Sequence, residues 1–173
     1  TLTAIKVSDP LHGALALNTN GSFTYTPATG YTGTDSFTYK ANDGVVDSNL
    51  ATATITINAV NQAPSFTRGA NQTILEDSGM QSVSNWATAI SAGPSDESGQ
   101  ALNFIIVSNS NPSVFSVAPA ISPTGTLTFT PATNVNGTAT ISIALHDNGG
   151  TANGGNDTSP TQSFTITITA VVQ

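Results

Sequence analysis

The sequence contains no cysteine, and only 8% of its residues are charged. Without disulfide bonds, a secreted domain must be stabilised by its core, by bound ions or by its neighbours. Three Lys and Arg residues against ten Asp and Glu residues give a net charge of −7. Such a chain has no basic patch for nucleic acid, and anionic membrane surfaces would repel it. It also lacks an apolar run of about 18 residues, so membrane insertion is not expected.

Thr, Ser and Asn supply the polarity that charged residues usually provide. Together with 15 Gly and 9 Pro, they favour strands joined by turns. The helix formers Lys, Arg, Glu and Met are scarce, which disfavours long helices. Apolar and polar residues alternate along several segments, which places the apolar set on one buried face. These segments are residues 23–26, 37–41, 141–145 and 164–168. The sequence therefore predicts an all-β protein.

The chain repeats itself. GSFTYTPATGYTGTDSFTYKAND at residues 21–43 aligns without gaps with GTLTFTPATNVNGTATISIALHD, which begins 104 residues later. After seven extra residues in the second copy, ITINAVNQ at 55–62 matches ITITAVVQ at 166–173. A repeat of about 105–110 residues is typical of an immunoglobulin-like β-sandwich.

The two copies differ in how much of the repeat they contain. Residues 61–173 are predicted to form a complete sandwich of about seven strands, and residues 1–60 the C-terminal part of another, with five. The first copy lacks about 40 opening residues by this alignment. Either the chain is cut from a longer one, which we favour, or another chain supplies the missing strands.

The closing segment of the first copy, FTYKANDGVVDSNLATATITINAVNQAP, resembles the end of a cadherin repeat. GSFTYTP followed by GTDSFTYKANDG is similar to the bacterial cadherin-like and VCBS-type repeats of large secreted adhesins. The resemblance covers nearly the whole chain. It implies tandem immunoglobulin-like (cadherin-like) β-sandwiches, the first one incomplete, in an extracellular or cell-surface protein.

In cadherins, the linker and two loops at the start of each domain bind Ca²⁺ together, and the resemblance implies a similar site here. Oxygen atoms of carboxylates, amides and carbonyls on loops suit this ion. The linker AVNQAP, however, has Ala59 and Gln62 where cadherins place acidic ligands. The alternative is that the acidic residues cap turns and stay solvated. The candidate ligands are Asn61, Asp96, Glu97, Asp147 and Asp157.

Catalysis is not expected. The sequence has no Gly-x-Ser-x-Gly motif and no thiol nucleophile, and its two histidines, His12 and His146, belong to different copies. Nor does it offer a His, Cys and carboxylate cluster that would bind zinc. The single tryptophan, Trp86, is expected in the core, although an exposed Trp could stack on a sugar.

These observations favour a structural role, as a spacer or stalk segment whose partners are neighbouring repeats of the same polypeptide. Calcium would stiffen the linker if it binds. Two alternatives remain open. The modules could themselves bind carbohydrate or a surface protein, or the chain could self-associate into an extracellular fibre in which a neighbour's strands complete the first copy.

Overall fold

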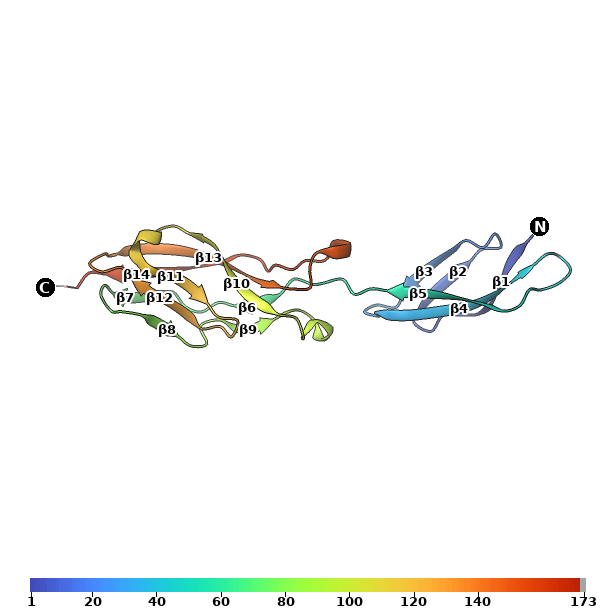
Figure 1. Cartoon of the computed structure of the whole chain (residues 1–173), viewed down its shortest axis with the longest axis horizontal. Helices are drawn as coiled ribbons and strands as arrows, with labels where there is room; N and C mark the ends of the chain where they lie inside the picture. Colours follow the sequence, from blue (N-terminus) through green and yellow to red (C-terminus); the bar gives the residue numbers. More distant parts are fainter. Residues whose placement is uncertain (172–173) are drawn as a thin grey trace. The chain divides into compact units, whose positions relative to one another are not determined.

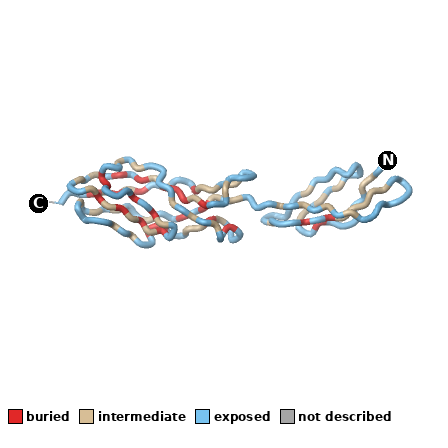
Figure 2. The backbone as a smooth tube through the Cα atoms, viewed as in Figure 1, coloured by how far each residue is buried: buried red, intermediate tan, exposed pale blue. Residues whose placement is uncertain are grey.

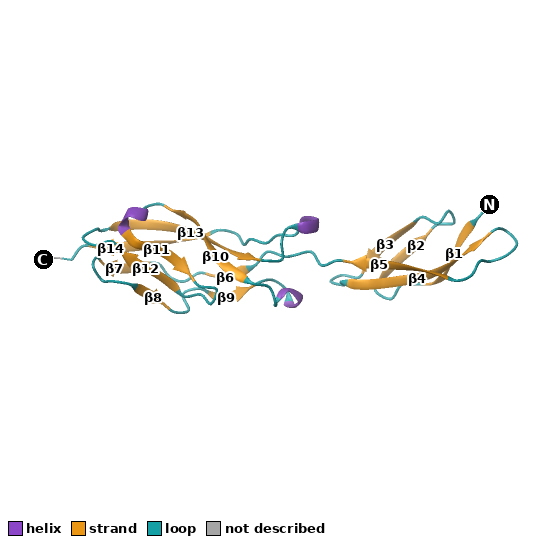
Figure 3. Ribbon diagram, viewed as in Figure 1, coloured by secondary structure: helices purple, strands orange, loops and turns teal. Residues whose placement is uncertain are grey.

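The computed structural model describes residues 1–171, which form two compact units. We call Thr1–Ala59 unit 1 and Val60–Gln173 unit 2. Both are built of strands, and the helical content of the described residues is three single-turn 3-10 helices (Figures 1 and 3). Within residues 1–171, no helix is long and apolar enough to cross a membrane. The prediction of an all-β fold is confirmed.

Unit 1 consists of a three-stranded sheet and a hairpin. The sheet has the antiparallel order β1 (Thr3–Ser8), β4 (Gly33–Asn42), β5 (Ala51–Ile57). The hairpin pairs β2 (Gly13–Leu17) with β3 (Phe23–Pro27). These five strands match the number that the alternating pattern predicts.

Asp35 joins the two layers of unit 1. It lies on β4, is 5% exposed, and accepts hydrogen bonds from the backbone N–H groups of Leu11 (3.0 Å) and His12 (2.8 Å) and from the Tyr25 hydroxyl (2.8 Å). Burial raises the pKa of Asp35, but these bonds and one from the Ser36 N–H outweigh it and lower the pKa to about 2. Burial and the same carboxylate raise the pKa of Tyr25 to about 12.

Unit 2 has a four-stranded sheet in the order β10-β13-β14-β7, a three-stranded sheet in the order β11-β12-β8, and the pair β6–β9. The pairing is antiparallel except between β14 and β7, which run parallel. The strands are β6 (Ser65–Thr67), β7 (Gln72–Leu75), β8 (Gln81–Val83), β9 (Thr88–Ser91), β10 (Leu102–Asn109), β11 (Phe115–Ile121), β12 (Leu127–Pro131), β13 (Gly137–Asp147) and β14 (Gln162–Thr169).

Within residues 60–171, unit 2 therefore has nine strands, and the prediction of about seven was too low. The reason is length. β6 and β8 contain three residues each, and β7 and β9 four. Segments this short do not show enough alternation to be recognised as separate strands.

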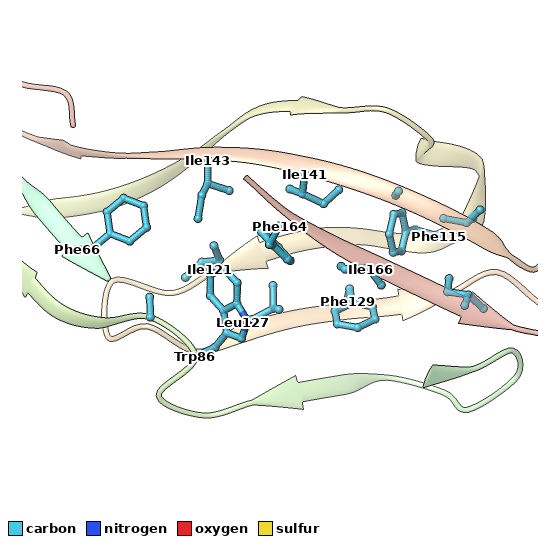
Figure 4. Packing of buried hydrophobic residues seen from close by; sticks show 14 of the residues in the cluster. Phe66, Trp86, Phe115, Ile121, Leu127, Phe129, Ile141, Ile143, Phe164 and Ile166 are labelled. Carbon is cyan, nitrogen blue, oxygen red and sulfur yellow. The ribbon is translucent and has the colours of Figure 1, made fainter. Parts of the chain in front are cut away.

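The two sheets of unit 2 enclose a hydrophobic core, shown in Figure 4. Trp86 is 3% exposed, lies with its ring centroid 4.4 Å from that of Phe164, and donates its indole N–H to the Ala70 carbonyl at 2.9 Å. The expectation that Trp86 belongs to the core is confirmed. Other buried members are Phe115, Ile121, Leu127, Phe129, Ile141, Ile143 and Ile166.

Unit 1 has much less of a core. In residues 1–59, Phe37 is the one large apolar side chain that is fully buried, at 2% exposure. Figure 2 shows the contrast, since buried residues are frequent in unit 2 and few in unit 1. A domain near 60 residues buries a smaller share of its surface than a larger domain does, and unit 1 accordingly has little apolar burial to stabilise it.

Candidate functional site

The strongest cluster of polar side chains lies at the start of unit 2, around Asn61. Its side-chain N–H₂ donates to Asp147 Oδ1 and to the Asn156 carbonyl, both at 2.9 Å. Its side-chain oxygen accepts from Gln100 Nε2 at 2.8 Å, and its carbonyl accepts from the Asn156 N–H at 3.0 Å. Asn61 is therefore bonded to the end of β13, to the loop after β13 and to the residues just before β10.

Two buried carboxylates belong to this cluster. Glu97 ends the 3-10 helix η1 (Ser95–Glu97), is 5% exposed, and accepts from the Gln62 N–H at 2.9 Å through Oε1. Asp147 ends β13, is fully buried, and accepts from the Gly149 N–H at 2.9 Å through Oδ1. The two carboxylates are thus bonded by adjacent residues, Asp147 by the side-chain amide of Asn61 and Glu97 by the backbone N–H of Gln62.

Glycine makes room for this packing. A Cβ added to Gly149 would collide with the Asn61 side-chain oxygen, and one added to Gly93 would collide with Glu97 Oε2. Both glycines thus leave space for a polar side-chain oxygen that approaches the backbone closely. The cluster is therefore tightly packed on the sides formed by these two loops.

Three oxygens of the cluster have no hydrogen-bond partner among the described residues. They are Glu97 Oε2, Gln100 Oε1 and Asp147 Oδ2, and all three are buried. Buried polar atoms are normally paired, and an unpaired carboxylate oxygen is especially costly. Oxygens from carboxylates and an amide are the ligands that Ca²⁺ prefers. The unpaired oxygens of these residues therefore suit a hard cation.

The predicted ligands divide into two groups. Asn61, Glu97 and Asp147 lie in the cluster. Asp96 is exposed on η1. Asp157 contributes its backbone carbonyl, which accepts from the Asp147 N–H at 2.9 Å, while its carboxylate lies 3.5 Å from His146 Nε2. Among residues 1–171, no three His, Cys, Asp or Glu side chains gather in one place, so the cluster depends on amides as much as on carboxylates.

Sequence reasoning missed Gln100 and the carbonyl of Asn156. Gln100 lies three residues after Glu97 and two residues before the start of β10. It could not be recognised because the chain is rich in amide side chains and most of them lie on the surface. The carbonyl of Asn156 carries no sequence signal, since every residue has one.

Comparison with known proteins identifies the fold. Residues 1–59 match the family model of the bacterial cadherin-like domain. Two crystal structures of the EC1-2 segment of human protocadherin-24 align with 97% and 99% of this chain and with 82% of theirs, each with a TM-score of 0.59, at 15% and 12% sequence identity.

A shorter match, in sequence, is to a third protein. Over 42 residues, or 24% of this chain, the sequence is 57% identical to integrin beta-like protein B of Dictyostelium discoideum. The aligned stretch is 2% of that protein's length, so the match relates a segment rather than two whole proteins. Taken together, the chain has a cadherin-like all-β fold, and its residues 1–59 match the bacterial cadherin-like domain.

Proposed function

We propose that this chain is a structural repeat, a spacer or stalk segment of a large extracellular adhesin-type protein of bacterial type. The observation that carries the proposal is the repetition itself. The same order of strands, with matching sequence, occurs in β1–β5 and in β10–β14, and the two sets lie in separate compact units. Tandem units with the same strand order, each with its own sheets, suit a segment that acts as a spacer.

The entry of the chain into unit 2 supports a spacer role. Asn61 and Gln62 are held by hydrogen bonds to Asp147, Gln100 and Glu97. These bonds fix the backbone at the point where the linker becomes the domain. A spacer holds the parts at its two ends at a defined distance, and a fixed backbone at the start of unit 2 serves that purpose.

We propose further that Ca²⁺ binds at this cluster in the extracellular medium. Glu97, Asp147 and Gln100 would supply the oxygens that have no partner within the described residues, and Asn61 could present its own oxygen by rotation of the side-chain amide. When bound, the ion supplies positive charge that balances the two buried carboxylates. The protein's part is to hold these oxygens together and to keep the linker against the loop after β13.

Thermal unfolding with and without Ca²⁺ tests this site. We expect Ca²⁺ to raise the unfolding midpoint of unit 2 and a chelator to lower it, since Ca²⁺ at 100 times Kd would add about 2.7 kcal/mol to the free energy of unfolding. Asp147→Asn should abolish the response, because it removes a buried carboxylate of the cluster, whereas Asp96→Asn, at an exposed acid on η1 beside Glu97, should keep it. Identical midpoints in Ca²⁺ and chelator for the wild type would exclude the site.

Binding of the chain itself to carbohydrate is the alternative from another functional class. Trp86 is buried and cannot serve as a sugar platform. The partly exposed aromatic stack of His12 on Tyr31, with centroids 4.1 Å apart, remains a candidate surface. A glycan array with the isolated chain separates the two roles. A spacer predicts no signal above an unrelated β-sandwich, and saturable binding that His12→Ala or Tyr31→Ala removes would establish the binding role.

A further inference from the structure

The outer edge of β10 in unit 2 has no neighbouring strand among the described residues. β10 is the first strand in the order β10-β13-β14-β7, so one of its edges pairs with β13 and the other is free. It is eight residues long, and its Ile105, Ile106 and Val107 are exposed. A long apolar edge strand is a template for the addition of another strand.

The other edge strands of the two larger sheets of unit 2 are protected. β7 and β8 are only four and three residues long. β11 contains Pro119, which has no backbone N–H, and its pairing with β12 is interrupted twice. Short strands, proline and irregular pairing all prevent edge-to-edge association. β10 contains no proline, and its pairing with β13 is regular over residues 102–106.

Unit 1 protects the corresponding edge with a lysine. β1 is the edge strand beside β4, as β10 is beside β13. Lys6 on β1 lies opposite Tyr39, Ile106 on β10 lies opposite Ile143, and in both strands the register shifts directly afterwards. Lys6 and Ile106 therefore occupy the same place in the fold. A lysine at a sheet edge opposes strand addition, whereas Ile106 leaves the edge of β10 apolar.

The backbone groups at the free edge of β10 belong to alternate residues. Leu145, opposite Phe104, donates its N–H to Ser159 Oγ at 2.9 Å and accepts from the Ser159 N–H at 2.8 Å. Its amide groups therefore point away from β10, and those of Phe104 point away from β13, toward the free edge. Because the pattern repeats every second residue, Leu102 and Ile106 also direct their N–H and C=O groups to this edge.

Charge favours a second copy of this chain as the strand that adds. The net charge of −7 makes two copies repel each other in general. Residues 98–145, which include β10 and most of β13, contain no Asp, Glu, Lys or Arg, so this repulsion is weakest where two β10 edges meet. A two-fold axis also makes the two strands antiparallel, so one and the same edge supplies both partners.

We propose that unit 2 self-associates through β10, which pairs antiparallel with β10 of a second copy about a two-fold axis at Phe104. Leu102 then lies opposite Ile106 of the second copy, and the two four-stranded sheets become one continuous sheet. The contact is small, so a single pair is weak, and chains that carry several such edges associate more firmly. The pairing involves unit 2 alone and depends neither on Ca²⁺ nor on the spacer role.

Hydrogen exchange at single amides of the full-length chain tests this pairing. As the concentration rises from about 0.02 to about 1 mM, exchange at Leu102, Phe104 and Ile106 should slow about threefold, which is the effect of pairing about two thirds of the chains. Asn103 and Ile105, whose amides already face β13, should exchange at an unchanged rate. Exchange that does not change at any of the five positions would overturn the proposal, as would equal slowing at all five.

Two lysine variants separate pairing at this edge from a general change in charge. Ile106→Lys gives β10 the residue that β1 has at the corresponding position, and it should remove the concentration dependence. Thr138→Lys adds the same charge at an exposed position of β13 and should keep it. Trp86 fluorescence reports whether unit 2 is folded in each variant, and the wild-type exchange rates decide alone if Ile106→Lys unfolds. Persistence of the effect in folded Ile106→Lys, or its loss in Thr138→Lys, would contradict pairing through β10.

Discussion

Units 1 and 2 carry the same motif with different amounts of burial. Phe37 and its counterpart Ile141 are both buried, at 2% and 0% exposure, because each lies on the middle strand of its sheet. Phe23 and its counterpart Leu127 differ, at 47% and 0%. The alternation of apolar and polar residues therefore determines which face of a strand is apolar, whereas burial of that face requires the neighbouring strands to be present.

A second pair of positions shows the same dependence on neighbours. Asp43 and Asp147 occupy corresponding places at the end of the long middle strand. Asp43 is exposed and accepts from the N–H groups of Val45 and Val46, both at 2.8 Å, which lowers its pKa. Asp147 is buried and bonded to Asn61. One aspartate caps a turn, and the other belongs to a cluster that the preceding linker completes.

The chain offers separate optical reporters for the two units. Its single Trp, at position 86, lies in unit 2, and its three tyrosines, at positions 25, 31 and 39, all lie in unit 1. Unfolding of unit 2 can therefore be followed by Trp fluorescence and that of unit 1 by the tyrosine signal in the same sample.

The largest change in the free energy of unfolding is expected from truncating apolar side chains at corresponding positions of the two units. Leu127→Ala should lower the free energy of unfolding of unit 2 by about 2–5 kcal/mol, because it opens a cavity in a closed core. Phe23→Ala should cost unit 1 clearly less, since its side chain already contacts solvent. Urea titrations with the two reporters measure both. Equal losses of stability in the two units would show that Phe23 is as well buried in solution as Leu127.

A smaller effect is expected from crowding the Asn61 cluster. Gly149→Ala should destabilise unit 2 by about 1–3 kcal/mol, because the added methyl group needs the space of the Asn61 side chain. Gly99→Ala is the matched control, since a Cβ there meets nothing within 4 Å. If Gly149→Ala unfolds at the same urea concentration as Gly99→Ala, the cluster is not tightly packed in solution.

The smallest effect is expected from the protonation of Asp35 in unit 1. The pKa of Asp35 is lowered from 3.8 to about 2, so its contribution to stability is present above pH 4 and is lost as the pH falls toward 2. The corresponding residue in unit 2 is Ala139, which cannot titrate. Asp35→Asn should flatten the dependence of the tyrosine-detected midpoint between pH 4 and pH 2, and an unaltered slope would show that other groups dominate.

Much of the fold could be predicted from the sequence, and the reasons are local. β4 and β13 are 10 and 11 residues long and alternate clearly, so period alone identifies them. β6 and β8 could not be identified in this way, because three residues do not define a period. Their positions depend on the pairing of β6 with β9 and of β8 with β12, and this pairing forms only in the folded chain.

The candidate site was predictable in outline for a different reason. Glu97 and Asp147 could be named because the resemblance to cadherin repeats implies acidic ligands in these two loops. Gln100 could not, because amides are common and its role depends on lying beside Asn61, 39 positions away. Asp157 differs from these, since its carboxylate lies 3.5 Å from His146 Nε2 and its backbone carbonyl accepts from the Asp147 N–H.

The parallel pairing of β7 with β14 has a mechanical consequence. β7 lies near the beginning of unit 2, and β14 is its last strand. Opposed forces applied at the two ends of the unit would therefore slide these strands along each other, and their hydrogen bonds would share the load and break together. An antiparallel pair pulled from one end opens one bond at a time. The β7–β14 pair of unit 2 is thus loaded in shear by tension, whereas all strand pairs of unit 1 are antiparallel.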